Sequence, residues 1–126
     1  MRLTAKGEYA LRLVLNLARR EEGKLYQLEE ITKKEKISSS YLYQLVKNLK
    51  RDGIIISSRG PGGGYALGRP AKEISILQVL ASAGEQVQTM STNLQKSQSS
   101  TNIDAFFITL DKMILKKLDK PITFIL

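Results

Sequence analysis

The sequence predicts a mainly α-helical fold with one small β-hairpin, and three observations support this prediction. Apolar residues recur at helical spacing in separate segments between residues 4 and 118. A single glycine-rich stretch, residues 57–64, lies between two short runs suited to strands. The chain has 126 residues, the size of one compact domain with at most a modest appendage. We therefore expect one core, built mainly from helices.

Residues 4–20 predict a largely buried first helix. Their polar residues recur about every four positions, which leaves one solvent-facing stripe on an otherwise apolar helix. The residues that follow, Glu21, Glu22 and Gly23, are expected to end the helix, because glycine is favoured at a helix C-terminus. Leu25 and Tyr26 then predict a short extended piece.

Residues 28–53 predict two further helices joined by a tight connector. The first spans residues 28–33, and residues 34–37 break its period. Three serines, residues 38–40, come next, and a serine before an apolar-periodic segment favours a helix N-cap. The core-facing stripe of the longer helix comprises Leu42, Leu45, Val46 and Leu49. A short helix, a connector and a longer helix with a basic, amide-rich outer face are typical of a helix-turn-helix.

The rest of the chain predicts a hairpin and two more helices. Residues 54–56 and 65–67 are expected to be strands, and the glycine-rich tip between them can take positive φ and approach a surface closely. A hairpin after a helix-turn-helix is a wing, so residues 1–84 predict a winged-helix domain. Within it, residues 73–83 form a fourth helix. Residues 85–103, rich in Gln, Ser, Thr and Asn, predict a mobile, sensor-type loop, and residues 104–126 a last helix and tail.

Charge and composition favour a binding protein over an enzyme. Lys and Arg number 20 against 12 Asp and Glu, a formal charge of +8, and most of this excess lies in residues 1–84. Such a surface attracts nucleic acid or an anionic membrane. The chain has no Cys and no His, which excludes thiolate nucleophiles, Ser–His–Asp triads and zinc sites built on those ligands. No apolar run of about 18 residues or export signal is found, so we expect a cytoplasmic protein without a membrane span.

Two features carry the groups that DNA recognition needs. The outer face of the third helix combines hydroxyls, amides and cations, and Gln44 can form the paired hydrogen bonds that suit adenine. Arg59 directly precedes the glycines of the wing, and a slim cationic hairpin fits the minor groove. The plainer alternatives are a solvated surface helix and an ordinary glycine-rich turn.

Three segments resemble the Rrf2 family of bacterial transcription regulators: residues 1–12 (MRLTAKGEYALR), 37–45 (ISSSYLYQL) and 59–67 (RGPGGGYAL). The similarity covers residues 1–84. It implies a winged-helix homodimer that binds a near-palindromic operator in double-stranded DNA with the third helix in the major groove and the wing in the minor groove. We expect the regulator to be a repressor. The DNA-binding residues expected from this resemblance and from side-chain chemistry are Ser38, Ser40, Tyr43, Gln44, Lys47, Arg59, Gly60, Gly62 and Gly63.

The resemblance also assigns dimerisation to the last helix. The residues agree, because its apolar stripe is too large for so small a domain to bury alone. The alternative is that this helix packs back on its own monomer. The predicted dimerisation residues are Phe106, Phe107, Leu110, Met113, Ile114 and Leu118.

Two departures from the family pattern affect specificity and sensing. Many relatives have Glu where this chain has Tyr43, a change expected to alter the bases that are tolerated. Cluster-binding members hold an iron–sulfur cluster through Cys-x5-Cys-x5-Cys and a fourth ligand three residues on. In this chain those positions are Ser91, Ser97, Ile103 and Phe106, none a soft ligand, so we expect no cofactor or metal.

These replacements have two explanations. One is a natural family member without a cluster, and the other is a chain in which serine was engineered in place of cysteine. Ile103 and Phe106 favour the first, because engineering rarely introduces such residues. The signal would then be a different small-molecule or protein effector. A separate alternative for the whole chain is a winged-helix interaction module that docks an acidic protein partner.

Overall fold

The computed structural model describes residues 3–21, 23–85 and 102–126, and its architecture confirms the predicted helical fold with one hairpin. A two-stranded antiparallel sheet, β1 and β2, follows the first three helices. The elements in chain order are α1 (Ala5–Ala18), α2 (Leu28–Glu35), α3 (Ser39–Arg51), β1 (Ile55–Ser58), β2 (Gly64–Leu67), the 3-10 helix η1 (Ala71–Glu73), α4 (Ile76–Ser82), α6 (Asn102–Leu118) and the 3-10 helix η2 (Ile122–Ile125).

Helix α1 is capped by a carboxylate that lies far away in the sequence. Thr4 precedes the helix in an extended conformation and its own side chain caps nothing. Instead, Glu85 Oε2 accepts hydrogen bonds from Thr4 N–H at 3.1 Å, Thr4 Oγ1 at 2.6 Å and Gly7 N–H at 3.1 Å. A helix N-terminus leaves its first N–H groups unpaired and favours negative charge, so a carboxylate suits this position. Glu85 is therefore buried, although the sequence placed it in a loop.

The ends of α1 and α2 differ slightly from the prediction. Helix α1 ends at Ala18, before the predicted Glu21–Gly23 stop: the Arg19 N–H still bonds to Leu15 O, but the Arg20 N–H bonds to Leu17 O in a tighter turn. Helix α2 continues to Glu35 and closes at Lys36, which adopts the left-handed conformation at φ 55°. The connector to α3 is thus shorter than residues 34–37.

Helix α3 has the cap and the buried face that its sequence predicts. Ser38 is its N-cap, and the Ser38 hydroxyl accepts from the Tyr41 N–H at 3.4 Å. The four buried residues of the helix are the predicted stripe, Leu42, Leu45, Val46 and Leu49. This burial fixes the orientation of α3, so the opposite face is presented to solvent.

The hairpin forms a small sheet with a third, very short partner. Strand β1 pairs with β2 in the register Ile55–Leu67 to Ser58–Gly64, so both strands extend further toward the tip than predicted. Tyr26 forms an isolated bridge with Tyr65, through Tyr26 N–H to Tyr65 O at 2.9 Å and Tyr65 N–H to Tyr26 O at 2.8 Å. The predicted extended piece at Leu25 and Tyr26 thus pairs with the wing.

Helix α4 starts later than residue 73 because of a capping box. The Ser75 hydroxyl accepts from the Gln78 N–H and the Gln78 amide oxygen accepts from the Ser75 N–H, both at 3.0 Å. Residues 71–73 form η1 instead, and Ile74 is extended, so the first part of the predicted helix is not α-helical. Gly84, at φ 83°, follows the end of α4 as expected.

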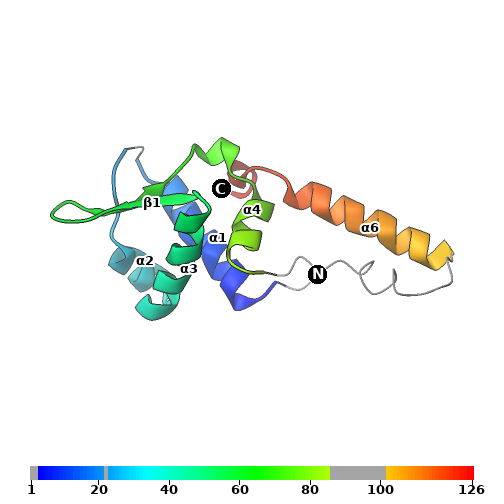
Figure 1. Ribbon diagram of the computed structural model, residues 1–126, viewed down its shortest axis with the longest axis horizontal. Helices are drawn as coiled ribbons and strands as arrows, with labels where there is room; N and C mark the ends of the chain where they lie inside the picture. The colour runs from blue at the N-terminus through cyan, green and yellow to red at the C-terminus, as the bar shows by residue number, and fades with distance from the viewer. Residues whose placement is uncertain (1–2, 22, 86–101) are drawn as a thin grey trace.

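The core lies in the winged-helix body, and the wing and α6 extend from it in opposite directions (Figure 1). The C-terminal tail returns to this body: Ile122 N–H donates to Ile74 O at 2.8 Å, and the Ile122 side chain is fully buried. Within α6 only Asp111 is buried. In the described ranges, no helix is long and apolar enough to cross a membrane. The largest fully buried side chains are Leu13, Leu28, Ile31, Leu42, Leu49, Ile54, Ile55, Ile74, Leu80 and Ile122.

Candidate nucleic-acid interface

The outer face of α3 presents a row of exposed polar side chains. Ser40, Tyr43, Gln44 and Lys47 are spaced i, i+3, i+4 and i+7, and all are exposed. Ser38 is also exposed at the start of the helix, where its hydroxyl is used as a cap. The structure therefore brings together all five residues that the sequence selected from this helix. Hydroxyl, amide, phenol and ammonium groups on one helical face are suited to base edges and phosphates in a major groove.

The tip of the wing is a tight turn that displays one arginine. Gly63 N–H donates to Gly60 O at 2.9 Å, which closes a four-residue turn with Pro61 and Gly62 at its centre. Gly62 has φ 76°, and proline followed by a residue of positive φ is the pattern of a type II turn. Arg59, just before this turn, is exposed, as are Gly60 and Gly62. The wing thus offers a cation on a backbone of very small cross-section.

Gly63 differs from the other residues predicted to contact DNA, because it is buried. A Cβ atom at this position would lie 2.4 Å from the Ser58 carbonyl oxygen. The Gly63 carbonyl accepts a hydrogen bond of 2.5 Å from Gln27 Nε2. The structure therefore gives Gly63 a place inside the turn, where it shapes the tip and ties it to the residue preceding α2.

Two residues that the sequence analysis did not select hold the wing against the body. Gln27 reaches the tip, and Tyr26 pairs with Tyr65 on β2. This pairing requires glycine at position 64, where φ is 152° and a Cβ would meet the Tyr26 backbone at 2.7–3.0 Å. Burial raises the pKa of the Tyr65 hydroxyl, and the nearby Tyr43 and Glu29 raise it further. The base of the wing thus lies close to the exposed face of α3.

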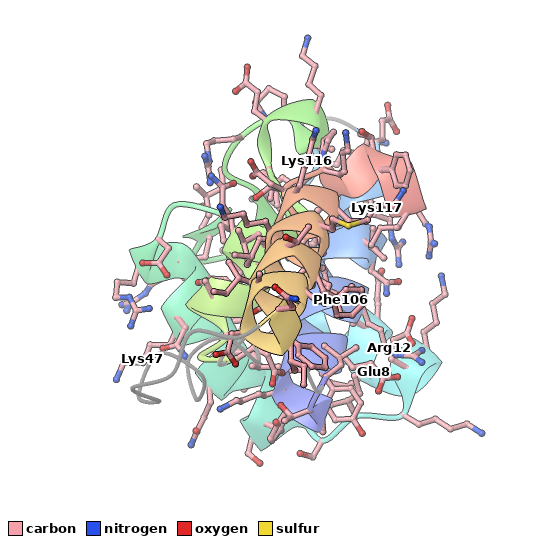
Figure 2. All side chains as sticks on the ribbon, turned by 90° about the vertical axis from the view of Figure 1, so that its right-hand side faces the viewer. Glu8, Arg12, Lys47, Phe106, Lys116 and Lys117 are labelled. Atoms are coloured by element: carbon pink, nitrogen blue, oxygen red, sulfur yellow. The ribbon has the colours of Figure 1, made fainter. Side chains whose placement is uncertain are left out.

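A polar cluster fixes α2 against α1. Asn16 is buried and its Nδ2 donates to Arg12 O at 2.7 Å and to Glu35 Oε1 at 2.9 Å. Arg12 bonds the other Glu35 oxygen at 2.9 Å and also pairs with Glu8 at 2.8 Å. In the view along α6, Glu8 and Arg12 lie together on one side and Lys47 on the other (Figure 2). This cluster sets the position of α2, and through it the turn that leads into α3.

The cluster predicts a specific dependence of stability on pH. The hydrogen bond from Asn16, then that from Arg12, holds the pKa of Glu35 below its ordinary value. A lowered folded-state pKa contributes stability above the unfolded pKa, and this is lost as pH falls through the folded pKa. We expect Glu35→Gln to destabilise the protein near neutral pH and to flatten the loss of stability as the pH falls from neutral into the acid range. Urea unfolding across this range measures both effects.

The matched control for this prediction is Glu29→Gln. Glu29 is an exposed carboxylate on the same helix and forms no ion pair within the described part of the chain. The control should follow the pH profile of the unchanged protein. Identical profiles for the two variants would show that Glu35 does not couple folding to pH.

Cations without ion-pair partners accompany the predicted contact residues. In the portion that the structure describes, neither Lys47 nor Arg59 forms an ion pair, and both are exposed. They can therefore neutralise phosphates without first breaking an internal contact. Among the same residues no group of three or more Asp or Glu side chains could hold a metal ion.

Comparison with known proteins places this geometry in a family. The model of the Rrf2 family, described as an iron-dependent transcriptional regulator, matches residues 3–121. The chain belongs to the Rrf2 family. The regulator IscR of Cronobacter sakazakii is 42% identical over 87 residues, which are 69% of this chain and 54% of that protein, and IscR of Escherichia coli gives the same values. The chain spans about half the length of these curated relatives.

Solved Rrf2-family structures share the whole described arrangement. The oxidised form of Staphylococcus aureus CymR matches with a TM-score of 0.80 and 28% identity over 99% of this chain and 95% of that one. CymR of Bacillus subtilis, the global cysteine regulator, matches with a TM-score of 0.85 over 98% of this chain and 94% of that one. Its sequence identity is 22%, so this match shows a common fold. These matches confirm the winged-helix fold, and the relatives are transcriptional regulators rather than enzymes, as expected.

The residues of this Rrf2-family chain do not fit an iron–sulfur cluster. The chain has no cysteine or histidine at any position. Of the four positions expected from the family pattern, Ile103 and Phe106 are exposed apolar side chains on α6, and Ser91 and Ser97 lie outside the described residues. A hydrocarbon side chain cannot donate an electron pair to iron.

Proposed function

We propose that this chain is a sequence-specific DNA-binding regulator that represses transcription by occupying a near-palindromic operator. Helix α3 lies in the major groove and the wing enters the minor groove. The observation that carries this proposal is the placement of two elements that carry predicted contact residues: α3 and the wing both lie on the side of the body away from α6 (Figure 1). The predicted residues on α3 and Arg59 on the wing are exposed. The protein acts in the cytoplasm and responds to an effector other than an iron–sulfur cluster.

A homodimer supplies the second half-site contact. Helix α6 exposes Ile103, Phe106 and Met113, at 65%, 63% and 64%, on a helix whose own monomer buries only Asp111. An apolar face of this kind is suited to the same face of a second copy, because a twofold interface is self-complementary. The alternative of packing on its own monomer applies to Leu118, which packs against the core, and not to these three exposed residues. Two α3 helices related by a twofold axis match a palindromic operator.

The proposal is tested by selection from a pool of random duplexes. The purified chain should enrich one palindromic sequence, and fluorescence anisotropy should show that its affinity falls steeply as salt is raised, because phosphate neutralisation releases counterions. A scrambled duplex of equal length is the control. Equal affinity for the selected and scrambled duplexes at every salt concentration would contradict the proposal and favour a module that docks an acidic protein.

Removal of the wing cation should weaken operator binding. We expect Arg59→Ala to cost about 1–3 kcal/mol of binding free energy on the selected duplex, by loss of a groove contact. The matched control is Arg19→Ala, which removes an exposed arginine from the end of α1. Fluorescence anisotropy at equal salt concentration measures the operator affinity of both variants. Equal losses of affinity would show that the effect of Arg59→Ala comes from net charge alone.

A further inference from the structure

A cavity of about 760 Å³ lies beside the base of the wing and outside the predicted DNA-contacting residues. Its walls come from the end of α1, the segment that follows β2, and η2 of the C-terminal tail. Ala66 and Leu67 of β2 lie on one side, and Thr123 adds a hydroxyl. This volume falls within the range that holds metabolite-sized ligands.

The charged side chains that line this cavity are mainly cationic. Four are positively charged, Arg20, Lys24, Arg69 and Lys72, and one is a carboxylate, Glu21. Two of the cations already have partners: Lys24 pairs with Glu21 at 2.7 Å, and Arg20 with Glu30 at 3.3 Å. Arg69 and Lys72 form no ion pair within the described ranges. The uncompensated positive charge is thus concentrated on these two residues.

Arg69 also has a buried donor without an acceptor. Its Nε atom is removed from solvent and makes no hydrogen bond to the residues that the structure describes. A buried donor left unpaired is costly, and proteins nearly always satisfy such groups. The guanidinium fork is shaped to bind two oxygens of a carboxylate or a phosphate at once. Because the Nε atom is closed to solvent, an oxyanion in the cavity would be bound by the terminal N–H groups of Arg69.

The backbone that carries Arg69 is held rigidly. Gly68 N–H donates to Ile54 O at 2.8 Å, and a Cβ at position 68 would lie 2.5 Å from the Gly53 carbonyl oxygen. Pro70, which follows Arg69, has its φ fixed by its ring. These contacts fix the backbone position from which the Arg69 side chain extends into the wall of the cavity.

We infer that this cavity binds a small dianion, a phosphorylated or polycarboxylated metabolite, through Arg69 and Lys72. The carbonyl end of α1 carries partial negative charge, so the anion is placed toward these two residues and away from the helix end. Arg20 and Lys24 add longer-range attraction. Thr123 is a neutral hydrogen-bonding group for an uncharged part of the ligand.

The position of the cavity connects the ligand to the wing. Ala66 and Leu67 belong to the strand that continues to the tip, so a bound anion touches the element that presents Arg59. This regulatory step rests on the proposed function, whereas anion binding itself does not. The ligand changes DNA affinity by shifting the position of β2.

The binding step is tested without DNA. Two-dimensional ¹H–¹⁵N NMR of the labelled protein is recorded during titration with pyrophosphate and with citrate, with sodium chloride as the ionic-strength control. We expect a saturable shift of the Arg69 Nε–H signal with one or both probes, and the probe that binds more tightly distinguishes phosphate from carboxylate. Chloride should leave this signal in place. No saturable shift with either probe would overturn the inference.

Variants separate a specific site from general charge. Lys72→Gln removes an exposed cation of the cavity and is expected to weaken binding about tenfold or more. Lys112→Gln removes an equal charge from the exposed surface of α6 and should leave the affinity unchanged. Equal weakening by both variants would overturn the inference. The inference would also be overturned if duplex DNA shifted the Arg69 Nε–H signal and neither small anion did. Arg69 and Lys72 would then belong to the DNA-binding surface.

The regulatory step has its own measurement. Operator affinity is compared with and without the bound probe at matched ionic strength, in the unchanged protein and in Lys72→Gln. A change of several-fold in the unchanged protein alone supports coupling between cavity and wing. Saturable anion binding with unchanged operator affinity would overturn the coupling and leave the binding site in place, so the two failures are distinguishable.

Discussion

The double substitution Phe106→Glu and Met113→Glu is expected to convert the dimer to a monomer and to weaken operator binding by about 100-fold or more. Two linked half-site contacts gain avidity of this order, and the gain is lost when the subunits separate. Both residues are exposed on α6. Two carboxylates on each apolar face would have to be buried against their copies in a dimer, where they repel each other and lose their hydration. Sedimentation velocity measures the association state, and anisotropy the affinity.

The matched control is Lys112→Glu, which lowers the net charge by the same two units on an exposed position of α6. Lys112 is six positions from Phe106 and one position from Met113 in the sequence. Neither spacing is close to a multiple of the helical period, so Lys112 lies on a different face of α6 from these two residues. The control should remain a dimer. A monomeric control, or a dimeric double variant, would show that the exposed apolar face of α6 does not hold the two copies together.

The elements and their buried faces could be predicted because their signals are local. The stripe that begins at Leu42 repeats with the helical period, so it determines both the existence of α3 and the face that it turns outward. Ser38 could be assigned as a cap for the same reason, since capping depends on neighbours three residues away. The exposed row that includes Tyr43 and Gln44 follows directly, because it is the other side of that helix.

The features that sequence reasoning missed depend on residues far apart in the chain. Thr4 and Glu85 are separated by 81 positions, and Gln27 and Gly63 by 36. No periodicity indicates such pairs, and a glutamate after a glycine is ordinarily a solvated residue. Gly63 could be assigned to the wing tip but not to its interior, because a run of glycines does not show which one lies against neighbouring carbonyls. The capping box of Ser75 and Gln78 is different: its spacing could have been found from sequence.

The position of Glu85 also connects the fold to the segment that follows it. Its carboxylate holds the start of α1, and Glu85 is itself the first residue of the segment 85–103 that the sequence predicts to be a sensor-type loop. The same α1 carries Asn16 and Arg12, which position α2. The contacts of Glu85 and the contacts that position α2 thus involve the same helix.

Removal of this carboxylate is expected to be strongly destabilising. Glu85→Ala leaves the N–H groups of Thr4 and Gly7 and the Thr4 hydroxyl without their acceptor. Hydrogen bonds to a charged group are strong, and the Gly7 N–H is buried and cannot turn to solvent, so we expect a loss of about 2–4 kcal/mol of unfolding free energy. Urea unfolding measures it. Glu73→Ala, at an exposed glutamate, is the control and should change stability by less than about 0.5 kcal/mol.

A second substitution tests whether the carboxylate itself sets the requirement for glycine at position 7. A Cβ at Gly7 would lie 2.3 Å from Glu85 Oε2, so Gly7→Ala should destabilise the protein while Glu85 is present. In the Glu85→Ala background the obstacle is gone, and alanine should then stabilise α1 by about 0.5–1 kcal/mol, because it is the better helix former. The other close atom, Leu3 Cδ1 at 2.9 Å, is the end of a flexible side chain and can move. A double-mutant cycle measures this change of sign, and an equal effect of Gly7→Ala in both backgrounds would show that the Glu85 cap does not determine the residue at position 7.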